Sequence, residues 1–134
     1  MARIRHIALV VKDLEKTANF YQKALGLTRS EISEGPTARR IFMSDGEINL
    51  ALLQYKSEVG SGLKDPQAFV GIHHIGFQVD DLKEQQAAIE AAGGEFFFDL
   101  GQEDDEGFER KFKDPNGIIF DINHKGWTMT SGKK

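Results

Sequence analysis

The chain of 134 residues has no cysteine, only three prolines and no long apolar run. Without cysteine it has no disulfide framework, no thiolate metal site and no cysteine nucleophile. Its apolar runs are far shorter than the roughly 20 residues that a membrane span needs, so no membrane partner is expected. Strand-like sequence begins almost at Met1, which argues against a leader segment. A cytoplasmic location is therefore the expectation.

An excess of positive charge is also lacking. Asp and Glu number 21 against 17 Lys and Arg, the net charge is −4, and no block of basic residues occurs. A nucleic acid is therefore not expected as a partner, because its phosphate backbone is bound by clustered Lys and Arg. The composition, 40% hydrophobic and 28% charged, is ordinary for one globular domain with a buried core.

What the chain does contain is an internal repeat. The segment His6-Ile-Ala-Leu-Val-Val-Lys-Asp-Leu14 returns about half a chain length later as His74-Ile-Gly-Phe-Gln-Val-Asp-Asp-Leu82, with more than half of the positions identical. We infer that a whole supersecondary unit has been duplicated, with a histidine at the same place in each copy. If the copies pack about an approximate two-fold axis, the two histidines converge on one point, which is a common way to hold a metal.

Both copies predict the same order of elements: a strand, a helix and three short strands. Asp13 and Asp81 are placed to cap the two helices, and glycines follow both helix ends. The chain is therefore predicted to be a single α+β domain, 1–134, of two tandem βαβββ modules. Strands are expected at 4–11, 28–33, 39–43, 48–54, 74–79, 95–98, 108–113 and 118–123, helices at 14–25 and 82–92, modules at about 1–54 and 72–124, a connector at about 55–71 and a C-terminal tail at about 125–134.

Strand parity predicts which side chains meet, because successive side chains point to opposite faces of a sheet. The bulky apolar residues that alternate with His6 and His74 need a covering helix, which leaves both imidazoles on the other, concave face. In the last strand Asp121 alternates with apolar neighbours in the same way. Three metal-ligand types are therefore expected to face one cavity. The alternative is that the histidines serve packing and that Asp121 is a solvated acid.

Two neutral imidazoles and one carboxylate suit a catalytic divalent ion that keeps coordination positions open. We therefore expect His6, His74 and Asp121 to bind a divalent metal ion. This donor set does not distinguish Fe, Mn, Ni, Co and Zn.

Candidate substrate-binding residues follow from similar positional arguments. Arg39 and Arg110 occupy equivalent positions in the two modules, counted back from their turn glycines. One or both are expected to bind a carboxylate or phosphate of the substrate through the guanidinium fork, and ion pairs on solvent-facing strands are the alternative. Gln78 shares the face of His74 and is expected to form a polar wall of the pocket.

Four segments resemble the vicinal-oxygen-chelate superfamily, which holds glyoxalase I, methylmalonyl-CoA epimerase, fosfomycin-resistance proteins, extradiol dioxygenases and bleomycin-binding proteins. The resemblance implies an open, curled mixed sheet around a central cavity with a metal, bound by His6, His74 and Asp121. The family's fourth ligand position falls at Ala51, and Asn49 is the next residue expected to face the substrate. The matching segments are His6-Ile-Ala-Leu-Val-Val-Lys-Asp-Leu-Glu, Phe20-Tyr21 with Leu25-Gly26-Leu27, Gly71-Ile-His-His-Ile-Gly-Phe-Gln-Val-Asp-Asp81, and Asp114-Pro-Asn-Gly117 with Ile119-Phe-Asp-Ile122.

The resemblance implies a metal-dependent enzyme that acts on a small molecule with two neighbouring oxygens. The first hypothesis is a lyase, isomerase or epimerase that works through a metal-chelated enediolate-type intermediate. The second is an Fe(II) ring-cleaving dioxygenase with a His-His-Asp triad. A metal-free small-molecule binding or antibiotic-resistance protein is the third. Ala51 counts against a standard glyoxalase I, no catalytic base is evident, and a homodimer is expected by analogy.

Overall fold

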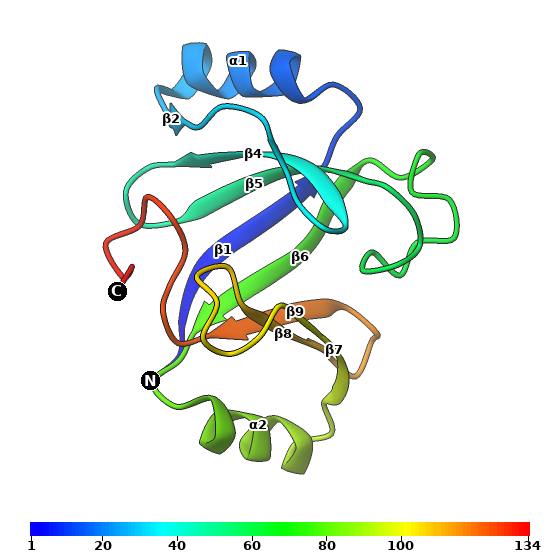
Figure 1. Cartoon of the computed structure of the whole chain (residues 1–134), viewed down its shortest axis with the longest axis vertical. Coiled ribbons are helices and arrows are strands. Elements are labelled where there is room, and N and C mark those ends of the chain that lie inside the picture. Colours follow the sequence, from blue (N-terminus) through cyan, green and yellow to red (C-terminus); the bar gives the residue numbers. More distant parts are fainter.

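The computed structural model describes residues 1–134 and joins nine strands in one open mixed sheet with two helices. The sheet order is β2-β4-β5-β1-β6-β9-β8-β7, and β3 pairs with β4. The expected α+β fold of two modules in one curled sheet is confirmed (Figure 1). The elements are β1 Arg3–Val10, α1 Leu14–Leu25, β2 Thr28–Arg29, β3 Ser33–Glu34, β4 Ala38–Ser44, β5 Asn49–Tyr55, β6 Gly71–Gln78, α2 Leu82–Ala91, β7 Glu95–Leu100, β8 Glu109–Lys113 and β9 Ile119–Asn123.

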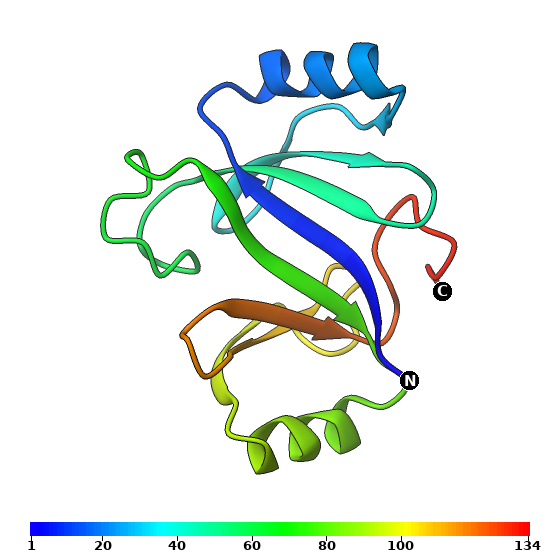
Figure 2. The same cartoon turned by 180° about the vertical axis from the view of Figure 1, so that it is seen from behind.

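The two modules meet where β1 and β6 pair in antiparallel orientation at the centre of the sheet. On either side the same arrangement follows, because β1 pairs in parallel with β5 and β6 pairs in parallel with β9. An approximate two-fold axis therefore passes between β1 and β6. Figure 2 shows these two strands crossing the middle of the molecule, with α1 and α2 at opposite ends.

Both helices begin where the sequence predicts, α1 also ends there, and α2 ends at Ala91, one residue before the expected end. Asp13 accepts a hydrogen bond from the backbone N–H of Lys16 at 2.9 Å, and Asp81 accepts one from Glu84 at 2.8 Å. Each carboxylate thus satisfies one of the N–H groups that a helix start leaves without a partner. Gly26 ends α1 in the left-handed region at φ 72°, which a residue without Cβ adopts at little cost.

The apolar side chains divide between the two faces of the sheet as strand parity requires. On the outer face of module one, Leu14 and Ala18 of α1 pack against a cluster in β4 and β5 that includes Ile41. In module two, Leu82 packs against an equivalent cluster that includes Phe112. The inner face of module one carries a separate apolar cluster. Its members are Ala8, Val10, Ala38, Ala51, Leu53 and Tyr55.

Besides shifts of one to three residues at the ends of other strands, two segments differ from the sequence expectation. The strand expected at 28–33 is split into β2 and β3, because the Ser30 hydroxyl accepts the N–H of Phe42 at 3.0 Å and interrupts the ladder. The C-terminal residues expected as a tail pack back on the domain, where the Ser131 N–H donates to the carbonyl of Gly46 at 2.8 Å. No helix of the structure is long and apolar enough to cross a membrane.

Removing the helix caps tests this local account. Asp13→Ala and Asp81→Ala should each lower the free energy of unfolding by about 1 kcal/mol, because each leaves a helix N–H without its partner. Urea denaturation measures the change. Asp104→Ala is the control, since Asp104 is an exposed loop residue whose carboxylate has no hydrogen bond, and it should have no effect. Equal effects of all three substitutions would contradict the capping role.

Candidate metal centre

The register of the central strands brings His6, His74 and Asp121 together. In the β1–β6 ladder His6 lies opposite Gly76, and His74 lies opposite Ala8, so the two histidines are diagonal neighbours on one face. In the parallel β6–β9 ladder Gly76 lies beside Asp121. The aspartate therefore lies in the same row across the sheet as His6, with only a glycine between them.

The three side chains meet at their functional atoms inside the protein. The exposed fractions of His6, His74 and Asp121 are 3%, 3% and 0%. The two imidazole Nε2 atoms are 3.2 Å apart, and Asp121 Oδ2 is 3.2 Å from His74 Nε2 and 3.8 Å from His6 Nε2. Ligands about 2.1 Å from one ion lie about 3.0–3.4 Å from one another. The cluster therefore has nearly the size that a shared ion requires.

Asn49 fixes which nitrogen of His6 carries the proton. His6 Nδ1 lies 2.8 Å from Asn49 Oδ1, an acceptor, so this nitrogen is the donor. The amide is held in that orientation because Asn49 Nδ2 donates to the carbonyl of Thr128 at 3.3 Å. His6 Nε2 consequently presents a lone pair to the cluster.

A longer chain of hydrogen bonds does the same for His74. His73 Nε2 donates to the carbonyl of Ser61 at 2.7 Å, so Nδ1 of a neutral His73 accepts a proton from His74 Nδ1 at 2.8 Å. Burial lowers the pKa of His73, which keeps that ring neutral. Burial also lowers the pKa of His74 to about 4, against the opposing effect of Asp121. His74 Nε2 therefore presents a second lone pair to the cluster at neutral pH.

Asp121 supplies the third lone pair. Its Oδ1 accepts from Lys111 Nζ at 2.8 Å, whereas its buried Oδ2 has no hydrogen-bond donor. Burial alone would raise the pKa of Asp121, but the imidazolium form of His74 and the Lys111 ammonium hold it well below its usual range, and Lys111 is the one of the two that stays charged at neutral pH. Two imidazole nitrogens and one carboxylate oxygen thus converge as acceptors with no proton among them. Such a group fits a bound cation, because buried acceptors without a donor are otherwise costly.

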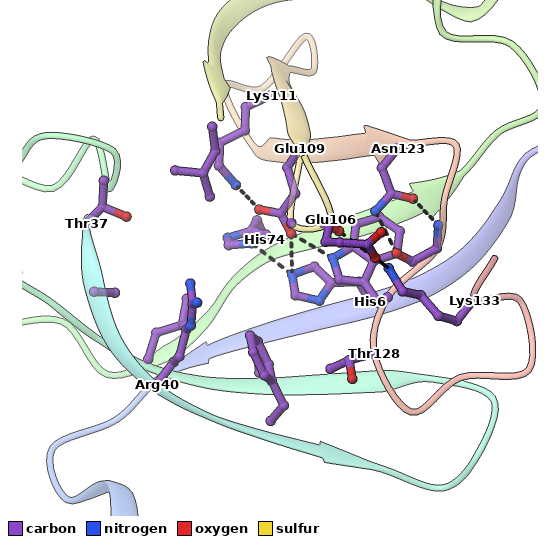
Figure 3. A pocket seen from close by; sticks show the side chains of 18 of the residues that line it. His6, Thr37, Arg40, His74, Glu106, Glu109, Lys111, Asn123, Thr128 and Lys133 are labelled. Carbon is purple, nitrogen blue, oxygen red and sulfur yellow. Dashed lines mark hydrogen bonds and ion pairs between the residues drawn. The ribbon is translucent and has the colours of Figure 1, made fainter. Parts of the chain in front are cut away.

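Glu109 is a cavity residue that the sequence reasoning missed. Its Oε2 lies 3.8 Å from His6 Nε2 and accepts from Trp127 Nε1 at 2.7 Å, and its Oε1 accepts from Lys111 Nζ at 3.2 Å. Trp127 itself stacks on His6, with ring centroids 4.8 Å apart and planes at 3°. The C-terminal segment therefore completes the site (Figure 3). Strand parity could have found Glu109, since it alternates with the apolar Phe108.

The two arginines expected to bind substrate lie outside the cavity. Arg39 is exposed and donates to Glu34 at 2.9 Å, while Arg110 donates to Asp99 at 2.9 Å. Parity explains the correction, because Arg39 shares its face with Ile41 and Arg110 shares its face with Phe112, and both of these apolar residues point toward the helices. The registers also show that the two positions are not equivalent, because the counterpart of Arg110 in module one is Ile41.

The other two expected substrate-binding residues are occupied by internal hydrogen bonds. Gln78 lies beside the C-terminal segment, where its amide donates to the carbonyl of Gly132 at 2.6 Å, and it does not line the cavity. Asn49 is fully buried and orients His6 instead of lining the cavity. The strand registers place Ala51 opposite Ala8 and Asp121 opposite Gly76, so Ala51 is the counterpart of Asp121 in module one.

The cluster opens on a cavity of about 310 Å³ whose two halves differ in polarity. Module two contributes charged and polar side chains, including Glu109, Lys111 and Asn123. Module one contributes mainly apolar groups, including Phe42 and Leu53. A bound ligand would therefore contact charged and polar side chains on one side and mainly apolar side chains on the other.

Filling the space at Gly76 tests the stacking of Trp127. A Cβ at Gly76 would lie 2.7 Å from Trp127 Cζ2 and 2.9 Å from the Cβ of His6. Gly76→Ala should therefore displace the indole, lower the free energy of unfolding by about 1–3 kcal/mol and shift fluorescence emission to the red. The signal is specific because Trp127 is the one tryptophan of the chain.

Gly107→Ala is the matched control, because a Cβ there would meet nothing within 4 Å. It should leave the emission spectrum unchanged. An unchanged emission maximum in Gly76→Ala would contradict the close packing of Trp127 on the site.

Comparisons with known proteins identify the family of the chain. Mouse methylmalonyl-CoA epimerase (Mus musculus, mitochondrial) is 30% identical over 89 residues, which are 61% of this chain and 48% of that protein, so the chain spans about half the length of this relative. Ethylmalonyl-CoA/methylmalonyl-CoA epimerase of Cereibacter sphaeroides is 28% identical over 69% of this chain and 72% of its own. Methylmalonyl-CoA epimerase of Streptomyces coelicolor, solved with 2-nitronate-propionyl-CoA, superposes with a TM-score of 0.70 at 24% identity, covering 90% of this chain and 94% of that one. A family model matches residues 3–122, and the chain therefore belongs to the Glyoxalase/Bleomycin resistance protein/Dioxygenase superfamily.

Proposed function

We propose that this protein is a divalent-metal-dependent isomerase of the epimerase kind, which moves a proton on a carbon next to a carbonyl group. The observation that carries the proposal is the convergence of three buried acceptors, His6 Nε2, His74 Nε2 and Asp121 Oδ2, without a proton among them. The likeness to methylmalonyl-CoA epimerases adds support for this class of reaction.

His6, His74 and Asp121 would hold the ion, and the chain has no fourth ligand at Ala51. A divalent ion bound there would supply Lewis acidity to two neighbouring oxygens of the substrate and so make the adjacent C–H bond more acidic. The protein's part is to keep both imidazoles in the ligating tautomer through Asn49 and His73.

Glu109 is the group placed to move the proton. It is the carboxylate that lines the cavity beside the cluster, 3.8 Å from His6 Nε2. Its carboxylate would take the proton from the substrate carbon while the electron pair of that C–H bond shifts to the carbonyl oxygen, and inversion would follow when the planar carbon receives a proton on its opposite face. Trp127 and Lys111 each donate to one of its oxygens and thereby fix its position.

Tyr55 is a less suitable base. Burial raises its pKa above the ordinary range, so the phenol stays protonated. It lines the apolar half of the cavity, with its oxygen 3.4 Å from His73 Nδ1. Glu109 is therefore the residue to which we assign proton transfer.

An Fe(II) dioxygenase is the second candidate. The observation in its favour is the count of ligands, because two histidines and one carboxylate leave several positions of the ion free for substrate and oxygen. Oxygen consumption with catechols by Fe(II)-loaded protein would support this reading. Proton exchange without oxygen consumption supports the isomerase.

Metal analysis tests the donor set. Protein purified without a histidine tag and incubated in turn with Mn, Co, Ni, Zn and Fe(II) should retain about one ion per chain. The double variant His6→Ala plus His74→Ala should lose it, because two of the three ligands are gone. His124→Ala is the control, since His124 lies outside the cluster. Equal metal content in the double variant and the wild type would contradict the site, and a wild type that retains none would favour a metal-free binding protein.

Replacing Glu109 separates proton transfer from ligation. In deuterated buffer with methylmalonyl-CoA as the probe, Glu109→Gln should slow exchange of the substrate's carbon-bound proton by about 10²–10⁴-fold while metal content stays unchanged. Glu95→Gln, an exposed carboxylate at the start of β7, should exchange at the wild-type rate. Wild-type exchange by Glu109→Gln would contradict its role, and loss of metal would make Glu109 a ligand instead.

The expected homodimer and cytoplasmic location stay predictions. Exposed apolar side chains on the central strands, Ile4 and Ile72, support association of two copies. Light scattering of the purified protein measures the number of chains.

A further inference from the structure

Arg40 is a cavity-lining arginine without a carboxylate partner. It lies on β4 next to Arg39 but with the opposite parity, so its side chain enters the cavity. Most arginines of the chain form ion pairs on the surface. Those with carboxylate partners are Arg5, Arg29, Arg39 and Arg110.

The protein holds the Arg40 guanidinium in place but leaves its outer edge free. Its Nε donates to the Ser33 hydroxyl at 3.2 Å, and its Cζ lies 5.2 Å from the centre of the Phe42 ring. A Cβ at Gly35 would collide with Nη1, so the absence of a side chain there gives the guanidinium room. Neither Nη atom has a hydrogen-bond acceptor in the protein, and Figure 3 shows the group extending into the cavity from β4. A pair of free N–H donors is the arrangement that binds a carboxylate with two parallel hydrogen bonds.

The other cations of the cavity already contact carboxylates of the protein. Lys111 contacts both Asp121 and Glu109, and Lys133 lies 2.9 Å from Glu106. The Thr37 hydroxyl also lines the cavity near Arg40 and has no hydrogen-bond partner (Figure 3). One end of the cavity therefore carries an unbalanced positive charge and an unused hydroxyl.

The strand registers show which residue of module two corresponds to Arg40. In module one Arg40 pairs with Leu53, which lies on β5 two residues after Ala51. In module two Glu109 lies on the same face of β8 two residues before Lys111, and Lys111 pairs with Asp121. Since Ala51 and Asp121 are counterparts, Arg40 is the counterpart of Glu109. In module two this duplicated position is therefore occupied by a carboxylate beside the side-chain cluster of His6, His74 and Asp121. In module one it is occupied by a cation without a carboxylate partner, across the cavity.

We propose that Arg40 binds a carboxylate of the substrate, so that the substrate is an acid whose oxygenated reactive end lies at the His6, His74 and Asp121 cluster. A carboxylate is favoured over a phosphate because one guanidinium balances a single negative charge, whereas a phosphate dianion would need further cations. The apolar side chains between the two ends, including Phe42 and Leu53, would contact a short carbon chain. This inference rests on the proposed function for the placement of the reactive end.

Binding of matched acids tests the proposal. The metal-loaded full chain would be titrated by calorimetry with 2-oxoglutarate and with 2-oxopentanoate, which lacks only the distal carboxylate, and with the corresponding six- and seven-carbon pairs. In at least one pair the diacid should bind about 10- to 100-fold more tightly, which is the strength of a charge-assisted double hydrogen bond. Arg40→Gln should abolish this ratio without changing binding of the monoacid, and Arg40→Lys should restore part of it.

Arg39→Gln is the matched control and should keep the wild-type ratio, because Arg39 points away from the cavity. A ratio near one for every pair, or an unchanged ratio in Arg40→Gln, would overturn the proposal. Tighter binding of the matched phosphonate than of the diacid would overturn the assignment to a carboxylate. Failure of the proposed function is a separate result, because it would appear as absent proton exchange while the diacid ratio persists.

Discussion

The antiparallel pairing of β1 with β6 is the constraint on which the site depends. It is the one ladder that joins the two modules, and its register sets His6 and His74 as diagonal neighbours on the concave face. A shift by one residue would turn one imidazole toward the outer face and its apolar neighbours toward the cavity. The helices packed on the outer face of each module resist such a shift, since they hold those apolar residues. The register that buries the apolar side chains is therefore the same register that places the metal-ligand candidates.

The duplication gives the two modules the same fold, and the site is formed at positions where the counterpart residues of the two modules differ. Asp121 has Ala51 as its counterpart, and the counterpart of Glu109 is Arg40. One module therefore supplies the carboxylates and the other supplies an apolar wall with a single free cation. Gly76 breaks the symmetry in a third way, because its missing side chain makes room for Trp127. The carboxylates of module two and the single free cation of module one give a bound molecule a defined direction.

Much of this could be predicted from sequence, because a repeat with alternating apolar residues determines both the fold and the face on which each strand residue lies. His6, His74 and Asp121 were found in that way. The same rule, had it been applied to β4 and β8, would have selected Arg40, Glu109 and Lys111 in place of Arg39 and Arg110. The path of the C-terminal segment could not be predicted, because it depends on long-range contacts such as that of Ser131 with Gly46 and the stacking of Trp127 on His6.

The central claim is that one cation joins the three buried acceptors. A crystal grown with Mn²⁺ and measured for anomalous scattering tests it most directly. The account predicts a single strong peak about 2.0–2.2 Å from His6 Nε2, His74 Nε2 and Asp121 Oδ2, with the Lys111 ammonium still on Oδ1. A map without a peak at this cluster, or with the peak bound by other residues, would contradict it.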